Sequence, residues 1–287
     1  MEKNTLVTKL KGSVSLDLPR LGELMLHIGN ESVQQGGSNT LQIQMVSGQE
    51  SVIRVDGTGS FGTTNGSYIY NKSNHYTLSS NSLTTLYFNS GEYNVYIGNK
   101  DNISQIRLGV ADQDMKSIVS MNLLDCRYLS SLVQLRLTNS LSVGNVDNCL
   151  DNSILQNLLK IYFTQSPGIT GNFSTLGNFN LTEIDLRSSG VTGTVEGFVA
   201  AQVARGKTTS SQITVVPITL GYSLRNITFG GLNIQTKTSL IWEDSGAKIA
   251  LYGGDDASAS TVYVKGYGTQ EQAEAAFPGK TVVRVDA

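Results

Sequence analysis

Two carboxylates stand two residues apart, as Glu183 and Asp185, in the stretch LTEIDLRSSGVTGTV at residues 181–195. Apolar residues alternate with them, so a strand here carries both carboxylates on one face and Ile184 on the other. A pair of carboxylates can hydrolyse a glycosidic bond when the two groups meet across a sugar. Glu183 and Asp185 are therefore the carboxylate pair to weigh first for catalysis.

The same two positions carry other side chains in similar stretches of the chain. They are Gln134 and Arg136 in one stretch, and Lys160 and Tyr162 in another. This polar and aromatic mixture favours recognition over catalysis. A solvated face with no specific partner is an equal alternative. The candidate interaction surface consists of Gln134, Arg136, Lys160, Tyr162, Glu183, Asp185 and Arg187.

A glycine-rich stretch, GTGSFG at residues 57–62, matches the Gly-x-Gly-x-x-Gly pattern of phosphate-binding loops. That chemistry needs a helix directly after the loop, whose N–H groups hold the phosphate. The residues that follow, TTNGSYIYN, read as a turn and a strand. The sequence therefore predicts a loop between strands here.

The other chemical groups give no catalytic pattern. His27 falls within a strand pattern and His75 within a polar loop, and neither belongs to a recognisable catalytic motif. Asp255 and Asp256 in GGDDASAS lack the spacing of a calcium loop, so a solvated turn is the better interpretation. No zinc-ligand cluster is visible, and we expect no metal and no cofactor.

The two cysteines, Cys126 and Cys149, could pair or remain as buried free thiols. No apolar run among the first twenty residues is long enough for a signal-peptide core, so we expect synthesis in a cytoplasm. In that compartment free thiols are the better interpretation, although pairing stays open.

Composition limits the classes of partner. The 287-residue chain has 21 basic and 23 acidic residues, a net charge of −2, and 39% hydrophobic residues. Such a chain has no basic field for a nucleic-acid backbone, so we expect no nucleic-acid partner. No segment approaches the roughly 20 apolar residues that span a bilayer, so we expect no membrane insertion.

The region before residue 103 reads as short strands with tight turns. Apolar residues alternate with period two, and Gly, Asn and Ser interrupt the pattern. We predict a small antiparallel β sandwich or barrel at residues 21–102. Within it, NSGE at residues 89–92 reads as the turn of a hairpin.

Beyond residue 102 a repeated pattern replaces simple alternation. Residues 181–195 place Leu, Ile, Leu, Val, Gly and Val at fixed spacings, and residues 132–146 and 158–173 follow the same template. Weaker copies occur at residues 103–108 and 118–123. One unit cannot bury its own apolar face, so the units must stack, with Leu135, Ile161 and Ile184 in one internal column.

Helical and terminal signals follow the repeats. Residues 195–206 read as a helix stopped by Gly206, and residues 151–160 as a second helix. Residues 260–285 read as strand, helix and strand, with a capping box formed by Thr269 and Gln272. That unit would cover the open end of a stack.

Over about residues 103–250 the chain resembles the leucine-rich repeat family. The Asn usual at the ninth position of the family pattern is replaced by Ser140, Ser166 and Ser189, which weakens the expected ladder of side-chain amides. The fold class expected is mainly β: a small antiparallel sandwich or barrel, an irregular leucine-rich-repeat solenoid and a β-α-β terminal cap. The expected divisions are 1–20 (arm), 21–102 (sandwich), 103–250 (solenoid) and 251–287 (cap).

The opening LKGSVSLDLPRLGEL, the ITG and VTG turns and the ending VYVKGYGTQEQAEAAFPGKTVVRV resemble predicted virion structural proteins of crAss-like tailed phages that infect Bacteroides. The resemblance implies a non-enzymatic protein of the capsid or tail, located in the virion. Its partners would be other virion proteins or copies of itself in an oligomeric assembly, and a host-surface glycan or protein.

The arm at residues 1–20 would anchor the chain by adding a strand to a neighbour's sheet. The alternatives are a bacterial surface adhesin or glycan-binding protein and, third, a glycan-active enzyme.

Overall fold

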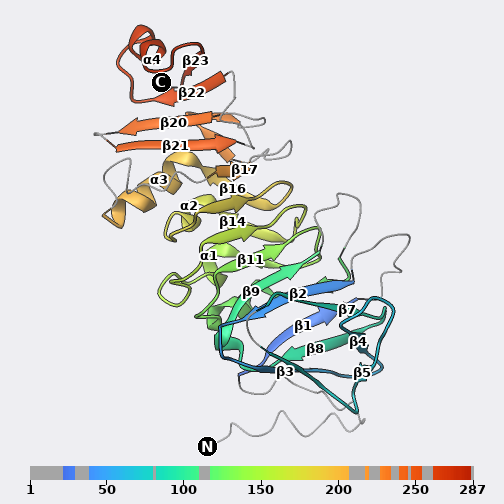
Figure 1. Cartoon of the computed structure of the whole chain (residues 1–287). Coiled ribbons are helices and arrows are strands. Elements are labelled where there is room, and N and C mark those ends of the chain that lie inside the picture. Colours follow the sequence, from blue (N-terminus) through green and yellow to red (C-terminus); the bar gives the residue numbers. More distant parts are fainter. Residues whose placement is uncertain are drawn as a thin grey trace, which may run out of the picture.

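The computed structural model describes residues 22–29, 39–79, 82–109, 117–206, 217–219, 227–233, 239–244, 247–253 and 261–285. The predicted N-terminal arm and the Asp255–Asp256 turn lie outside the described residues. The chain is mainly β, and its strands follow one another along the long axis of the molecule (Figure 1).

Two sheets pack face to face at the N-terminal end (Figure 1). Their strands alternate buried apolar and outward polar residues, as with Leu41 and Ile43 around Gln42. The first sheet has the order β10-β1-β8-β3-β6, with β1 at Leu24–Ile28, β3 at Ser51–Val55, β6 at Tyr76–Leu78, β8 at Tyr93–Ile97 and β10 at Val119–Ser120. The opposing strands are β2 at Thr40–Met45, β4 at Ser60–Gly62, β5 at Tyr70–Asn71 and β7 at Thr84–Phe88.

The predicted hairpin at residues 89–92 is wrong. β7 pairs with β2 and β4, whereas β8 pairs with β1 and β3, so residues 89–92 cross from one sheet to the other. The Tyr93 hydroxyl holds this corner by donating to the Asn89 carbonyl at 2.8 Å, and Ser60 N–H donates to the Asn89 side chain at 2.7 Å. Both strands face the same core, so their alternation is identical to that of a hairpin.

A long sheet continues from the sandwich into the rest of the chain. Its order is β23-β22-β20-β21-β17-β15-β13-β11-β9-β2-β7-β4-β5. β9 is the junction, because it pairs antiparallel with β2 and parallel with β11. The added strands are β9 at Ile103–Leu108, β11 at Gln134–Leu137, β13 at Lys160–Tyr162, β15 at Glu183–Asp185, β17 at Pro217–Thr219, β20 at Ser239–Asp244 and β21 at Ala247–Gly253.

The predicted internal column is present. Leu135 pairs with Ile161, and Ile161 pairs with Ile184, in parallel register. Each of the three side chains is fully buried. A single apolar core contains this column together with the core of the sandwich. The predicted boundary after residue 102 lies just before β9, the strand that connects the sandwich to the stacked units.

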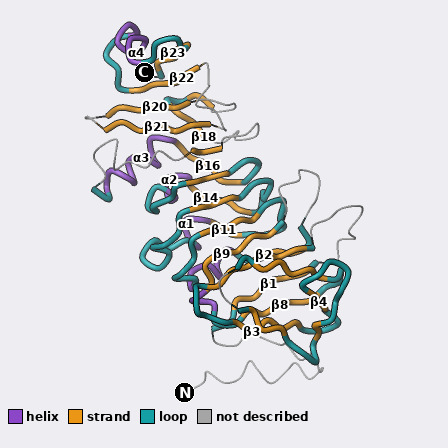
Figure 2. The backbone as a smooth tube through the Cα atoms, viewed as in Figure 1, coloured by secondary structure: helices purple, strands orange, loops and turns teal. Residues whose placement is uncertain are grey.

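A second sheet and short helices cover the other side of this core (Figure 2). Its strands are parallel from β12 to β18, and the last pair, β18 and β19, is antiparallel. The sheet order is β12-β14-β16-β18-β19, with β12 at Gly144–Asn145, β14 at Ile169–Asn172, β16 at Gly190–Thr194, β18 at Ile227–Phe229 and β19 at Leu232–Asn233. The helical turns are η1 at Lys100–Asn102, η2 at Leu123–Tyr128, α1 at Val146–Cys149, α2 at Phe173–Leu176 and α3 at Val195–Ala204.

The helical elements η2, α1, α2 and α3 each begin at a capping side chain. The side chains of Asn122, Asn145, Asn172 and Thr194 accept from the backbone N–H two or three residues later. α3 ends before Gly206, as predicted. The helix predicted at residues 151–160 is absent: Asp151 caps a turn instead, and the helix lies earlier, at α1.

The weak copy at residues 118–123 is also not a separate unit. It contains β10 and the N-cap Asn122, and Asn122 bridges in parallel to Val143 in the next unit. It is therefore the second half of the unit that begins at β9.

Buried serine hydroxyls form a chain of hydrogen bonds at positions where the sequence predicts a weakened ladder of amides. Ser166 Oγ accepts from Ser140 N–H at 3.3 Å, and Ser140 Oγ accepts from Ser142 N–H at 2.9 Å. Ser142 Oγ accepts in turn from Met121 N–H at 3.0 Å. Ser166 Oγ also donates to the Leu137 carbonyl, and Ser140 Oγ donates to Ser142 Oγ. The hydroxyls therefore satisfy backbone groups that apolar packing would leave without partners.

The C-terminal unit has the predicted order of strand, helix and strand. β22 spans Thr261–Lys265, α4 spans Gln270–Ala276 and β23 spans Thr281–Arg284. Thr269 and Gln272 form the predicted capping box at the start of α4. Among the described helices, none is long and apolar enough to cross a bilayer.

Candidate binding surface

The expected surface residues lie on β11, β13 and β15, or just after β15, on the face of the long sheet turned away from the apolar core. β9 and β2 extend this face, because both pair in register with the strands beside them. Two rows of polar side chains result. The arginine row is Gln42, Arg107, Arg136, Tyr162 and Asp185. The glutamine row is Gln44, Gln105, Gln134, Lys160 and Glu183.

Both carboxylates of the rows are in ion pairs. Lys160 Nζ lies 2.9 Å from Glu183 Oε2. Arg187 forms a fork with Asp185: its terminal nitrogen donates to Oδ2 at 2.6 Å and its Nε to Oδ1 at 3.0 Å. The Asp185 side chain is only 7% exposed. A buried carboxylate of this kind needs such a partner, so Asp185 and Arg187 hold each other in place.

Tyr162 and Glu183 set each other's protonation. Burial raises the pKa of the Tyr162 phenol, and the hydrogen bond and charge of Glu183 raise it further. Burial alone would raise the pKa of Glu183, but hydrogen bonds from Tyr162 and Lys160, with the charges of Lys160 and Arg136, lower it. At neutral pH Glu183 is therefore ionised and Tyr162 keeps the proton that it donates.

Sequence reasoning missed the part of the rows that β9 and β2 supply. Arg107 donates to Gln105 Oε1 at 2.8 Å and to Gln134 Oε1 at 3.2 Å. Gln105 donates in turn to Gln44 Oε1 at 2.6 Å. The Arg107 Nε is buried and has no hydrogen-bond partner. The weak repeat copy at residues 103–108 could have predicted the part on β9, because Gln105 and Arg107 occupy the template positions of Gln134 and Arg136.

The other candidate groups lie away from these rows. In the glycine-rich stretch, residues 57–59 lie in the loop that links β3 to β4, as predicted, and residues 60–62 form β4, with no helix directly after them. His27 lies on β1 with Nδ1 3.3 Å from Asn94 Oδ1, and His75 is exposed between β5 and β6. Within the described residues, no three His, Cys, Asp or Glu side chains gather in a way that could hold a metal ion.

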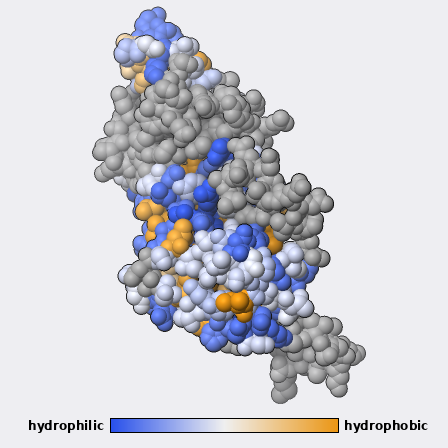
Figure 3. Space-filling model, turned by 45° about the vertical axis from the view of Figure 1, so that its right-hand side comes forward, coloured by the Kyte–Doolittle hydropathy of each residue, from blue (hydrophilic) through white to orange (hydrophobic). Residues whose placement is uncertain are grey.

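Large exposed apolar residues are few in the described part of the chain. They are Val52, Tyr68, Ile69, Leu124, Tyr128, Leu141, Val143 and Val203. On the face shown in Figure 3, hydrophobic residues form small patches within a mostly hydrophilic surface. The polar rows are continuous through the strand register, and two of their members, Gln134 and Asp185, are themselves buried.

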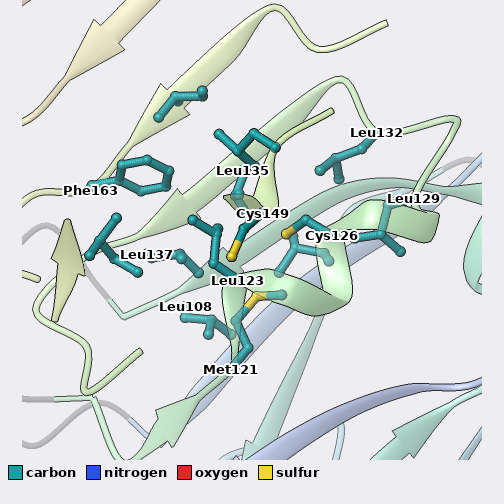
Figure 4. Packing of buried hydrophobic residues seen from close by; sticks show 14 of the residues in the cluster. Leu108, Met121, Leu123, Cys126, Leu129, Leu132, Leu135, Leu137, Cys149 and Phe163 are labelled. Carbon is teal, nitrogen blue, oxygen red and sulfur yellow. The ribbon is translucent and has the colours of Figure 1, made fainter. Parts of the chain in front are cut away.

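The two cysteines are free and buried at equivalent positions of successive units. Cys126 follows the N-cap Asn122 by four residues, and Cys149 follows Asn145 by four. Figure 4 shows both thiols among leucine side chains. Burial raises the pKa of the Cys126 thiol, and the nearby Asp125 and Cys149 raise it further.

We expect both thiols to react with an aromatic disulfide reagent at least about a hundredfold more slowly in the folded protein than in the denatured chain. The reactive form is the thiolate, and burial requires local opening before attack. Stopped-flow absorbance gives the rates, and Cys126→Ala and Cys149→Ala variants assign them. Rapid reaction of the folded protein, or fewer than two thiols in the denatured one, contradicts this expectation.

Comparisons with known proteins return nothing for this chain: no family model matches it, and neither do curated proteins or solved structures.

Proposed function

We propose that the chain is a non-enzymatic structural protein of a phage virion, associated with the capsid or tail, which presents the arginine and glutamine rows to a partner. The observation that carries the binding role is the in-register arrangement of the rows across β2, β9, β11, β13 and β15. Strands hold side chains more firmly than loops do, so such rows are ordered before a ligand arrives.

The stacked units are, in this proposal, a leucine-rich-repeat solenoid. Asn139, Gln165 and Ser188 support it, because each adopts a positive φ, between 49° and 56°, at the same place in its unit. Each stands just before a template serine. A left-handed residue recurring in this position is a feature of a repeated turn, and isolated strands have no reason to share it.

The site fits one of the two alternative functions from the sequence better than the other. A glycan-active enzyme needs one carboxyl group with a raised pKa as its acid. Glu183 has a lowered pKa and pairs with Lys160, while Asp185 is bound by Arg187. A glycan-binding protein fits better, since Gln44 and Gln134 carry amide N–H donors suited to hydroxyls, while their oxygens accept from Gln105 and Arg107.

Two variants distinguish the anchoring role of the N-terminal arm from the binding role of the rows. Deleting residues 1–18, which lie outside the described residues, should leave the melting temperature within a few degrees and abolish incorporation into particles or oligomers. Changing Arg136, Tyr162 and Asp185 together to alanine should leave incorporation intact. Light scattering and co-sedimentation with particles give the readout, and circular dichroism checks folding.

Three results would overturn this proposal. Assembly that survives the deletion and fails in the triple variant would make the rows the anchor. A chain that stays monomeric and never sediments with particles would favour the adhesin. Hydrolysis of glycans or peptides that Glu183→Gln abolishes would establish an enzyme.

A further inference from the structure

The centre of the two rows holds two arginines side by side. Arg107 on β9 and Arg136 on β11 are register partners on parallel strands, so their side chains leave the same face next to each other. Like charges directly opposite each other destabilise a sheet. The pair therefore needs an explanation beyond the stability of the fold.

Hydrogen bonds within the described residues leave both guanidinium groups without a carboxylate. Arg107 donates only to amide oxygens, and its Nε has no partner. Arg136 donates from Nε to Thr138 Oγ1 at 3.1 Å and lies over the Tyr162 ring at 5.5 Å. Arg136 also lowers the pKa of Glu183, but the hydrogen bonds of Glu183 go to Tyr162 and Lys160.

The charges in and beside the rows also show that the two arginines have no carboxylate partner among the described residues. The rows contain three cations, Arg107, Arg136 and Lys160, and Arg187 beside them adds a fourth. Glu183 and Asp185 are anionic, so four positive charges face two negative ones. The two carboxylates are taken by Lys160 and Arg187. The positive excess is therefore located at the arginine pair, in a protein whose overall net charge is −2.

We propose that Arg107 and Arg136 together bind the carboxylate of an acidic sugar laid across β9 and β11. Guanidinium groups hold carboxylates through paired, charge-assisted hydrogen bonds. This inference rests on the proposed binding role of the rows and names the class of ligand.

The surroundings of the pair favour a sugar over an acidic peptide. Gln42, Gln44, Gln105 and Gln134 flank the pair. The side-chain oxygens of Gln44, Gln105 and Gln134 accept from neighbours within the rows, so Gln44 and Gln134 offer hydroxyls their amide N–H donors. Peptide and protein partners depend on apolar and aromatic anchors buried in pockets. Tyr162 is the sole aromatic residue in the two rows, and its phenol is engaged with Glu183.

Matched ligands test the carboxylate directly. Isothermal titration of the full chain should detect 3′-sialyllactose or trigalacturonate with a dissociation constant of about 1 mM or tighter. Lactose and the methyl ester of trigalacturonate, which lack the charge, should bind at least about tenfold more weakly, because a charge-assisted hydrogen bond is lost. Added salt should weaken the binding of the acidic sugars.

Matched variants test the residues. Arg107→Gln and Arg136→Gln should each weaken binding at least about tenfold, and Arg136→Lys should weaken it less, because the charge stays and the fork is lost. Arg127→Gln, on η2 away from the rows, should bind as the parent does. Arg136→Gln should melt at or above the parent's temperature, since a like-charge contact has been removed. Arg107→Gln also loses the hydrogen bonds to Gln105 and Gln134, so its binding is compared with that of Arg136→Gln.

Several results would overturn the inference. They are no binding of either acidic sugar, equal binding of the uncharged controls, or tighter binding of polyglutamate than of the sugars. A lower melting temperature with unchanged binding would make the arginines structural. These outcomes are separate from those for the virion role, because incorporation into particles is measured without any sugar.

Discussion

Replacing Ile184 with Asp lowers the free energy of unfolding by about 3–5 kcal/mol, the usual effect of an uncompensated buried charge. Ile184 is fully buried and pairs in register with Ile161 on β13. Its column lies in the single core that the sandwich and the stacked units share. A charge at this point therefore affects both parts, and we expect one cooperative transition shifted to lower denaturant.

Two controls isolate the burial of the charge. Ile184→Val removes one methyl group and should lower the free energy of unfolding by about 1 kcal/mol. Val143→Asp introduces the same charge at a side chain that is 51% exposed, and should change it by less than about 0.5 kcal/mol. Urea unfolding followed by circular dichroism measures all three. Equal effects of the two Asp substitutions would show that the column is not a core.

The repeat column could be predicted from the sequence because its signal is local. Leu135, Ile161 and Ile184 recur at one template position, and each sits within a short alternation of apolar and polar residues. Burial follows directly from such periodicity. The same holds for α3 and for the capping box of Thr269 and Gln272, where neighbouring residues determine the geometry.

Local sequence patterns do not predict which strands pair with each other. Phe88 and Tyr93 flank a turn sequence and belong to apolar alternations, yet they lie in opposite sheets. Alternation states which face of a strand is buried, but not which sheet contains it. The predicted hairpin failed for that reason, whereas the glycine-rich loop between β3 and β4 was correct.

Only part of the candidate surface could be predicted from the sequence, for a related reason. Arg136, Tyr162 and Asp185 could be aligned through the repeat, but Gln44 lies 61 residues from Gln105, its hydrogen-bond partner. β2 is antiparallel to β9 and shares no template with it, so no spacing rule connects the two. The serines of the repeat template show a different limit: their hydroxyls accept from backbone N–H groups, a role that the sequence pattern does not state.

Gly171→Ala should lower the free energy of unfolding by about 2–5 kcal/mol, combining backbone strain with overpacking between stacked units. Gly171 has φ +116°, which L residues rarely adopt. A Cβ there would lie 2.8 Å from Asn145 Oδ1 and 3.0 Å from Val146 N. These atoms belong to the N-cap and to the first residue of α1 in the preceding unit, so the absence of a side chain at Gly171 allows the two units to pack closely.

Gly193 repeats this relation one unit later, where a Cβ would lie 2.7 Å from Oδ1 of Asn172, the N-cap of α2. Gly206 is the matched control: its φ is +81°, but a Cβ there meets nothing within 4 Å. Gly206→Ala should therefore lower the free energy of unfolding by the strain alone, about 1–2 kcal/mol. If Gly171→Ala and Gly206→Ala unfold at the same denaturant concentration, close contact between successive units contributes nothing, and the glycines serve only the turns in which they stand.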